Sequence, residues 1–397
     1  MLLEIFLAIT IGIAAGTITG LTPGIHINLI GAIILSTLAF FLTLTSPIIL
    51  IIFITAMAIT HTFIDFIPSI FLGAPDEDTI LSILPGHELL KQGKGYEAIA
   101  LTTYGSAAAI IIILIIAPIF LFLLPKVNTI IKFLIPYLLI IASIFLITKE
   151  KYKLAAIIVF ILSGFLGIAV LNSNVTQPFL PMLSGLFGAS SLIISLKNKT
   201  TIPKQKIKKI NISLKSAFKP LLASSLTAPL CSFLPGIGSG QAAVLGISLI
   251  KPTKRNFLIL LGATNTVVLG LSFIIFYTIG RTRTGMAATI NQIFNTLSFN
   301  HILIIILTIT LTGIICFYYT LFLAKIFSKN IHKINYSYLS ISILIIISAI
   351  VLIFSGFFGF FIFIISTATG IFGILSDVKR INLMGSLVIP VILIYLL

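Results

Sequence analysis

Long, nearly uncharged apolar runs recur along this chain, and one of the clearest extends from Ala107 to Leu124. A bilayer core about 30 Å thick is crossed by roughly 20 helical residues, at about 1.5 Å per residue. A membrane β-barrel would need alternating apolar and polar residues, which these runs lack. With 58% hydrophobic and 9% charged residues, the 397-residue chain is also too apolar for a water-soluble domain. The sequence therefore predicts an all-α, polytopic transmembrane helical bundle.

Basic residues outnumber acidic ones, 25 against nine, which gives a net charge of +16. Most of them lie in short loops between apolar runs, as the positive-inside rule predicts for cytoplasmic loops. The charge therefore does not indicate a partner nucleic acid. Eight lysines gather in residues 197–219, which we expect to be a cytoplasmic connector between a first transmembrane half (1–196) and a second (220–397). Contact of this stretch with anionic membrane lipids is the alternative interpretation.

The two halves contain similar motifs in the same order. A Pro-Gly pair interrupts an apolar run within residues 20–28 and again within residues 233–241. Each interruption is followed by about one span of apolar residues, a further proline and then a polar turn. The other matching motifs are Pro47 with Pro252, the turns 73–79 and 280–285, and Gly185-Leu-Phe-Gly188 with Gly370-Ile-Phe-Gly373. These matches predict two structurally related halves.

The basic loops also indicate how the halves are oriented. Loops near Lys149, Lys251 and Lys379 are expected to be cytoplasmic, which places Pro47 outside and Pro252 inside. The motif-bearing segments would then be inverted relative to each other, as in many secondary transporters with broken helices. In this interpretation the first half holds one span more than the second, so the last motifs, Gly185–Gly188 and Gly370–Gly373, would not be inverted relative to each other.

The Pro-Gly interruptions are the first candidate for a functional site. Proline removes a helical hydrogen bond, and glycine lets the chain turn without a Cβ clash. In lipid, the freed backbone groups are tolerated only beside protein or a water-filled cavity, so we expect broken helices or re-entrant hairpins that line a cavity. A kink that serves close helix packing is the alternative. The residues expected to bind substrate or ion are Pro23, Gly24, His26 and Asn28 in the first half, and Pro235, Gly236, Gly238, Ser239, Gln241 and Asn265 in the second.

Ionisable residues at membrane depth are the second candidate. Asp65 follows His61 by four residues, so both face one side of a helix and are candidates for a proton or cation site. A hydrogen-bonded structural pair is the alternative. The two polar turns carry opposite charges, and we expect them to form a gate if they meet. If they lie on opposite faces of the membrane, their charges are ordinary loop charges. The residues of this expected gate are Asp76 and Asp78 in the first turn, and Arg281 and Arg283 in the second.

Common enzyme motifs are absent from the sequence. It contains no His-Glu-x-x-His zinc helix, no Gly-x-Ser-x-Gly elbow and no P-loop. We therefore expect no enzymatic activity, no resident cofactor and no metal site, and we expect no transport driven by the chain's own ATP hydrolysis. A coupling Na⁺ or H⁺ is the ligand that a secondary permease would use instead.

Several of these stretches resemble the TctA family, the large membrane subunit of tripartite tricarboxylate transporters. The most similar stretch begins at Ile67-Pro-Ser-Ile-Phe-Leu-Gly-Ala-Pro75 and continues through Leu84-Pro-Gly-His-Glu-Leu-Leu-Lys-Gln-Gly-Lys-Gly-Tyr-Glu-Ala98. Leu234-Pro-Gly-Ile-Gly238 and, less closely, Pro23-Gly24 are similar to the family's Pro-Gly motifs. Ala263-Thr-Asn265 is similar to its Asn-Ala element.

The resemblance implies a multi-pass permease of a prokaryotic plasma membrane that imports a small anionic solute, such as a carboxylate, by ion coupling. It implies membrane lipids, a binding protein and a small membrane subunit as partners. The acidic and arginine-containing turns replace the family's Pro-Gly and small hydroxyl residues, so its substrate and its accessory subunits do not carry over directly. A channel or exporter on the same scaffold and an intramembrane lipid-handling enzyme are the alternatives.

Overall fold

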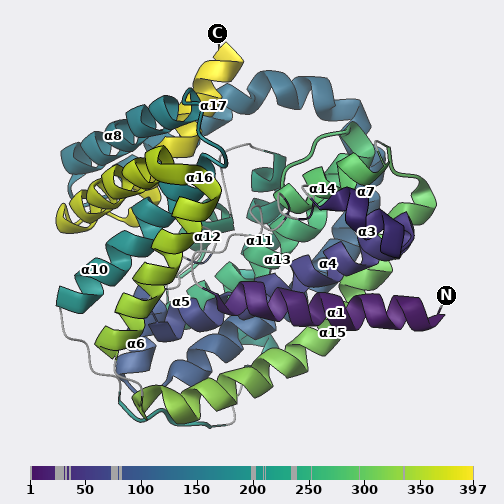
Figure 1. The fold of residues 1–397 in the computed structure, drawn as a ribbon, viewed down its shortest axis with the longest axis horizontal. Coiled ribbons are helices and arrows are strands. Elements are labelled where there is room, and N and C mark those ends of the chain that lie inside the picture. Colours follow the sequence, from purple (N-terminus) through teal and green to yellow (C-terminus); the bar gives the residue numbers. More distant parts are fainter. Residues whose placement is uncertain are drawn as a thin grey trace.

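The computed structural model of the chain is built from helices (Figure 1), and no strand occurs in the residues that it describes. Those residues are 2–22, 31, 34, 37–72, 79, 83–197, 203–208, 210, 212–233, 239–251, 253–294, 296–333 and 336–396. The all-α prediction is confirmed.

Most of the elements are α-helices, with one π-helix (η2) and two 3₁₀ helices (η3 and η4). In the first part of the chain they are α1 (Leu2–Leu21), α3 (Leu38–Leu44), α4 (Pro47–Ile64), α5 (Phe66–Leu72), α6 (Ile83–Lys91), α7 (Gly95–Thr148), α8 (Lys153–Leu171), α9 (Phe179–Leu183), η2 (Ser184–Ala189) and α10 (Ser190–Lys197). In the second part they are α11 (Leu214–Phe233), α12 (Ser239–Ser248), α13 (Lys254–Ile279), α14 (Gly285–Phe294), α15 (Phe299–Asn330), η3 (Ile331–Lys333), α16 (Tyr336–Leu375), η4 (Arg380–Met384) and α17 (Gly385–Leu396).

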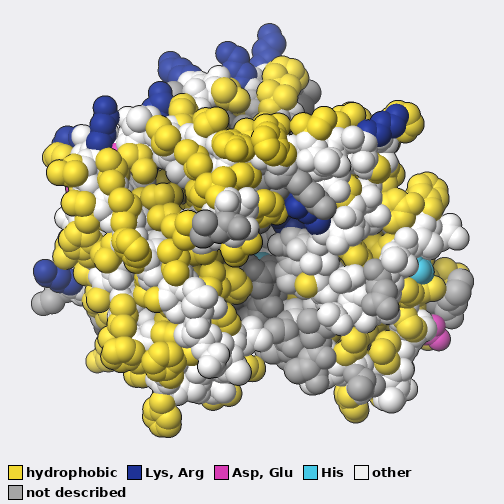
Figure 2. Space-filling model, turned by 90° about the horizontal axis from the view of Figure 1, so that it is seen from above, with side chains coloured by type: hydrophobic (Ala, Val, Ile, Leu, Met, Phe, Trp, Pro, Cys, Tyr) yellow, Lys and Arg dark blue, Asp and Glu magenta, His cyan; other side chains and the backbone are white. Residues whose placement is uncertain are grey.

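Seven helical segments in the described part of the chain are long and apolar enough to cross a membrane. They are Leu2–Leu21, Pro47–Leu72, Gly95–Ile130, Lys153–Leu171, Lys254–Ile279, Phe299–Lys333 and Ser340–Leu375. Large apolar side chains such as Phe122 and Phe165 remain exposed on these helices. Figure 2 shows apolar side chains spread over much of the visible face, with several Lys and Arg side chains at its edge. The surface is therefore suited to lipid, and the polytopic prediction is confirmed.

Two of the helices are too long for a single crossing. Helix α7 has 54 residues and contains Pro118, Pro125 and Pro136, so it would extend over roughly 80 Å if it were straight. Helix α16 has 40 residues and is interrupted at Gly356, whose φ of 66° and ψ of −172° are nearly restricted to glycine. Residues 336–355 and 357–375 are consequently two helical segments joined at this glycine.

The apolar interior is divided between two main packing clusters. The larger, which we call the large core, joins buried residues of α4, α5, α6, α7, α10, α13, α15 and α16. A smaller cluster, the small core, joins α8, η2, η4 and the second segment of α16. In Figure 1 the small-core helices gather on the left of the view. Helix α13 lies within the large core, and its 18-residue apolar window is entirely buried.

Glycines allow the helices to approach closely at several crossings. Gly12, Gly16 and Gly20 form a stripe on α1 that faces α4, and a Cβ added to Gly16 would lie 2.4 Å from the Met57 carbonyl oxygen. Small residues at intervals of four are a common means of bringing membrane helices together. This stripe places the end of α1 against the polar end of α4.

Candidate functional site

The middle of α13, which is buried on all sides, carries a polar triplet. Thr264, Asn265 and Thr266 are at most 3% exposed. The helix begins where the Thr253 side chain caps the Asn256 amide, and it ends at Gly280 in the left-handed conformation. Local sequence therefore fixes the ends of the helix, and packing on all sides buries its centre. Polar residues at such depth need partners from neighbouring helices.

Asp65 provides the partner for the amide of this triplet. It lies at the junction of α4 and α5, is 3% exposed, and its Oδ2 accepts a hydrogen bond of 2.8 Å from Asn265 Nδ2. An ionised carboxylate is costly to bury unless it is paired or hydrogen-bonded. Ionisable groups inside a membrane bundle are functional candidates for this reason.

Hydroxyl groups and an imidazole surround this pair. Thr62 and Thr266 hydroxyl oxygens lie 3.1 Å apart and provide a second link between α4 and α13. His61 Nδ1 lies 3.1 Å from Thr19 Oγ1 of α1, one helical turn before Asp65. We name these six residues the Asp65 cluster; they are Thr19, His61, Thr62, Asp65, Asn265 and Thr266. The cluster presents a single carboxylate together with neutral oxygen donors.

This donor set suits a proton or a small hard cation. Oxygen ligands are typical for hard cations, whereas transition metals favour thiolate and imidazole ligands. Among the described residues, no group of three or more His, Cys, Asp and Glu side chains is arranged to hold a metal ion. The chemistry that the cluster can support is exchange of one positive charge at the Asp65 carboxylate.

The predicted site residues are only partly within the described part of the chain. Ser239 is buried at the first turn of α12, and Asn265 contacts Asp65. Arg281 donates a hydrogen bond to Tyr395 Oη over 3.1 Å, and Arg283 is partly exposed before α14. The predicted residues that lie outside the described residues are Pro23, Gly24, His26, Asn28, Asp76, Asp78, Pro235, Gly236 and Gly238, together with the side chain of Gln241.

Sequence reasoning did not single out the α1 and α4 hydroxyls of the cluster. Thr19 sits between glycines of the α1 stripe, in Gly16-Thr-Ile-Thr-Gly20. A hydroxyl beside a close helix crossing is a signal that could have identified it. A cavity of about 550 Å³ lies elsewhere, between residues 172–176 and the Gly356 bend, and it contains none of the predicted site residues.

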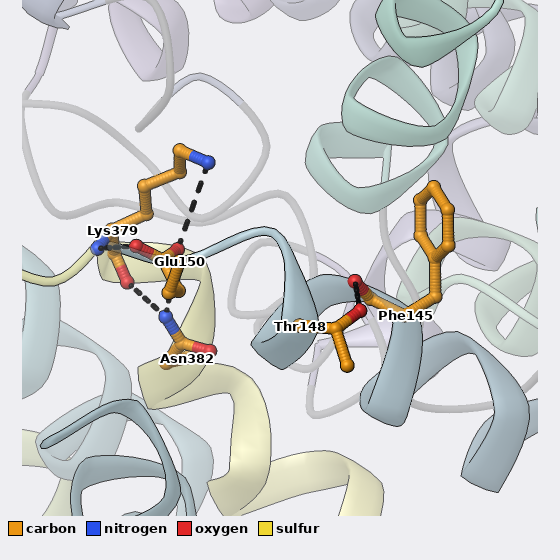
Figure 3. Close-up of polar contacts among 5 residues, drawn as sticks. All are labelled: Phe145, Thr148, Glu150, Lys379 and Asn382. Atoms are coloured by element: carbon orange, nitrogen blue, oxygen red, sulfur yellow. Dashed lines mark hydrogen bonds and ion pairs between the residues drawn. The ribbon is translucent and has the colours of Figure 1, made fainter. Parts of the chain in front are cut away.

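A second polar group joins the turn before α8 to η4 (Figure 3). Glu150 Oε1 accepts a hydrogen bond of 3.1 Å from Asn382 Nδ2 and lies 3.8 Å from Lys379 Nζ. Glu150 Oε2 accepts a longer bond of 3.4 Å from the Lys379 backbone amide. The Glu150 side chain is only 5% exposed, so these contacts compensate for a buried charge.

A polytopic helical bundle with a buried carboxylate–amide pair between two of its helices is typical of a membrane transport protein. The chain belongs to the Tripartite tricarboxylate transporter TctA family, whose model matches residues 6–385. This confirms the family resemblance, and it makes the chain a membrane permease of the tricarboxylate transporter type. The chain is also similar to the uncharacterized protein MJ1079 of Methanocaldococcus jannaschii, with 33% identity over 415 residues and 98% of each chain covered. No solved structure matches it.

Proposed function

We propose that this permease imports a small organic anion, such as a carboxylate, by coupling its uptake to Na⁺ or H⁺ at Asp65. The observation that carries the proposal is the 2.8 Å hydrogen bond between Asp65 and Asn265, buried between α4 and α13. A buried carboxylate is stabilised by any cation that neutralises it. Binding of the cation and of the anionic solute to one conformation would link their movements.

The packing of the two halves supports an alternating-access mechanism. Helix α1 packs on α4, and α11 packs on α13; α4 packs on α15, and α13 packs on α7. In the same way α8 packs on α17, and α16 packs on η2 and α10. Such an exchange of partners is what an inverted repeat related by a pseudo-two-fold axis would produce.

Asp65 and Asn265 then lie at the contact between equivalent helices of the two halves. Rocking of one half against the other would change their separation and their access to water. The Pro-Gly interruptions precede these two helices, and we retain the proposal that residues 23–28 and 235–241 complete the substrate site. The charged turns containing Asp76, Asp78, Arg281 and Arg283 remain a proposed gate.

Uptake into proteoliposomes tests the proposal. Radiolabelled citrate or succinate should accumulate in response to an imposed Na⁺ or H⁺ gradient. Asp65→Asn should lower gradient-driven uptake about tenfold or more, because a neutral amide cannot exchange the coupling charge. The matched control is Asp377→Asn, since Asp377 is an exposed residue whose φ of 54° asparagine also adopts.

The outcomes separate the alternatives. Wild-type accumulation by a well-folded Asp65→Asn protein contradicts coupling at Asp65. A conductance that does not depend on the imposed Na⁺ or H⁺ gradient favours a channel. Chemical alteration of the solute favours an enzyme. For the breaks, loss of uptake by Pro235→Ala or Gly238→Leu, with insertion preserved, supports a cavity rather than a packing kink.

We also propose a prokaryotic plasma membrane as the location, because the similar protein MJ1079 is archaeal. The family's tripartite name suggests a binding protein and a small membrane subunit as partners. Co-purification of a small membrane protein with the tagged chain from its native membrane tests this assembly. Full uptake by the chain alone in proteoliposomes would show that neither partner is required.

A further inference from the structure

Arg380 is a cation without an acidic partner in the described part of the chain. It is the first residue of η4 and is only partly exposed. Its Nη1 donates a hydrogen bond to Ser191 Oγ of α10, a neutral acceptor. The carboxylate of Glu150 is held by the neighbouring residues Lys379 and Asn382 instead. Burial lowers the pKa of Arg380 to about 10, which leaves the guanidinium positively charged at pH 7.

His87 on α6 adds an unsatisfied polar atom to the same region. Its Nε2 is buried and has no hydrogen-bond partner among the described residues. Burial lowers the pKa of His87 from its ordinary 6.5 to about 4, with smaller contributions from the charges of Lys91 and Arg380. Arg380 is therefore close enough to act electrostatically on the imidazole. The ring is therefore neutral at pH 7, well above this pKa.

An unsatisfied buried polar atom is expensive, and so is a desolvated charge without a counter-charge. The Arg380 guanidinium and the Lys91 ammonium both act electrostatically on the His87 imidazole, and all three groups can donate hydrogen bonds. The Ser191 hydroxyl donates to the Phe187 carbonyl oxygen and accepts from Arg380, so it positions the guanidinium. A planar guanidinium binds carboxylate and phosphate oxygens by two parallel hydrogen bonds. The group that would satisfy this arrangement is a small oxyanion.

We propose that Arg380 and His87 form a binding site for a carboxylate or phosphate group, with Ser191 as the residue that positions the Arg380 guanidinium. The site shares no residue with the Asp65 cluster and does not depend on coupling at Asp65. It lies between the two packing clusters, because Leu89 and Leu90 of α6 belong to the large core and Ile381 of η4 belongs to the small core. A bound oxyanion would link the two clusters.

The adjoining loops indicate the side from which the ligand comes. Lys91, Lys94, Lys197 and Lys379 border the site in the sequence, and basic loops are cytoplasmic. Two ligands with this chemistry reach that side: a dissolved carboxylate or phosphate, and the phosphate of an anionic lipid. The experiment must distinguish them.

Binding is measured on purified full-length protein with citrate and inorganic phosphate as probes. Isothermal titration gives the affinity, and NMR of ¹⁵N-labelled histidine follows the imidazole, with His87→Gln identifying its signals. Bound oxyanion should raise the His87 pKa by about one unit or more, as nearby opposite charges do. Arg380→Gln should weaken binding about tenfold or more, as expected for loss of a charge-assisted hydrogen bond.

Arg281→Gln is the matched control, because Arg281 is bonded to Tyr395 at another place in the structure. Asp65→Asn should keep the wild-type affinity for inorganic phosphate, which is not the proposed substrate, and this separates the site from the proposed coupling. If Arg380→Gln misfolds, Ser191→Ala is the second variant and should weaken binding several-fold.

The source of the ligand is tested by reconstitution in phosphatidylglycerol or phosphatidylcholine vesicles. A His87 shift with phosphatidylglycerol alone identifies a lipid headgroup, and a shift with citrate or phosphate in phosphatidylcholine identifies a dissolved anion. No shift with any probe overturns the site. Equal loss of affinity in Arg281→Gln and Arg380→Gln also overturns it, since binding would then reflect general charge.

Discussion

Asn265 Nδ2 donates a hydrogen bond of 2.8 Å to Asp65 Oδ2, and this bond joins α13 to the end of α4 across 200 positions of sequence. Both side chains are 3% exposed, so water does not compete for this hydrogen bond. The adjacent contact between Thr62 and Thr266 repeats the link with hydroxyl groups. Two polar links between the same helices fix their register at the centre of an apolar core.

Replacing the Asn265 amide should lower the stability of the protein, because the buried Asp65 carboxylate loses a hydrogen bond. We expect Asn265→Ala to lower the free energy of unfolding by about 1–3 kcal/mol, because it removes a hydrogen bond from Asp65 Oδ2. Thr264→Ala is the control, since the Thr264 hydroxyl donates to the Leu261 carbonyl within its own helix. Thermal unfolding in detergent measures both variants. Equal melting temperatures for the two would contradict a special role of the amide.

The glycine stripe of α1 should be sensitive to a single methyl group. A Cβ at Gly16 would lie 2.4 Å from the Met57 carbonyl oxygen, so Gly16→Ala must displace α1 from α4. We expect a loss of about 1–3 kcal/mol in stability and reduced uptake, because Thr19 moves away from His61. At Gly188 the nearest atom, Ile347 Cδ1, would be 3.7 Å away, so Gly188→Ala serves as control. A Gly16→Ala protein as stable and active as that control would show that the crossing is loose.

The cluster itself could be predicted only in part from the sequence. The spacing of His61 and Asp65 places both on one face of a helix, and Asn265 stands out as an amide in an apolar span. In the structure, however, the His61 imidazole lies beside the Thr19 hydroxyl of α1, and Asp65 accepts its hydrogen bond from Asn265 of α13. Which helix lies opposite depends on packing between distant segments, and this information is not present in local periodicity.

The Gly-x-Phe-Gly motifs illustrate the same limit. Their similarity in sequence indicates a repeat, and the structure places the two motifs against one another. A Cβ on Gly370 of α16 would lie 2.2 Å from the Leu186 carbonyl oxygen, and one on Gly185 would lie 2.6 Å from that of Phe363. Shared packing demands at one crossing therefore explain the similarity of these motifs, whether or not the halves are related.

The depressed pKa of His87 should make the protein less stable in acid. The folded state has a pKa of about 4 and the unfolded state has the ordinary 6.5, so the unfolded state binds more protons between these values. Stability is fully present above about pH 6.5 and falls as the pH decreases towards 4. In anion-free buffer, His87→Gln should show a smaller decrease in melting temperature between pH 7.5 and 4.5 than the wild type. The same decrease in both proteins would assign the acid sensitivity to other groups.

Glu150 should contribute more to stability than the lysine with which it forms an ion pair. Its buried carboxylate accepts hydrogen bonds from Asn382 Nδ2 and the Lys379 backbone amide, and these bonds attach η4 to the turn before α8 (Figure 3). The Lys379 side chain is 54% exposed, and exposed ion pairs contribute only about 0–1 kcal/mol. We expect Glu150→Ala to cost about 1–3 kcal/mol, because it leaves the Asn382 amide without its acceptor in a buried site. Lys379→Gln keeps the backbone donor and should cost about 1 kcal/mol or less. Chemical denaturation of the two variants in detergent gives the order directly, and a larger loss for Lys379→Gln would mean that the exposed ion pair dominates this contact.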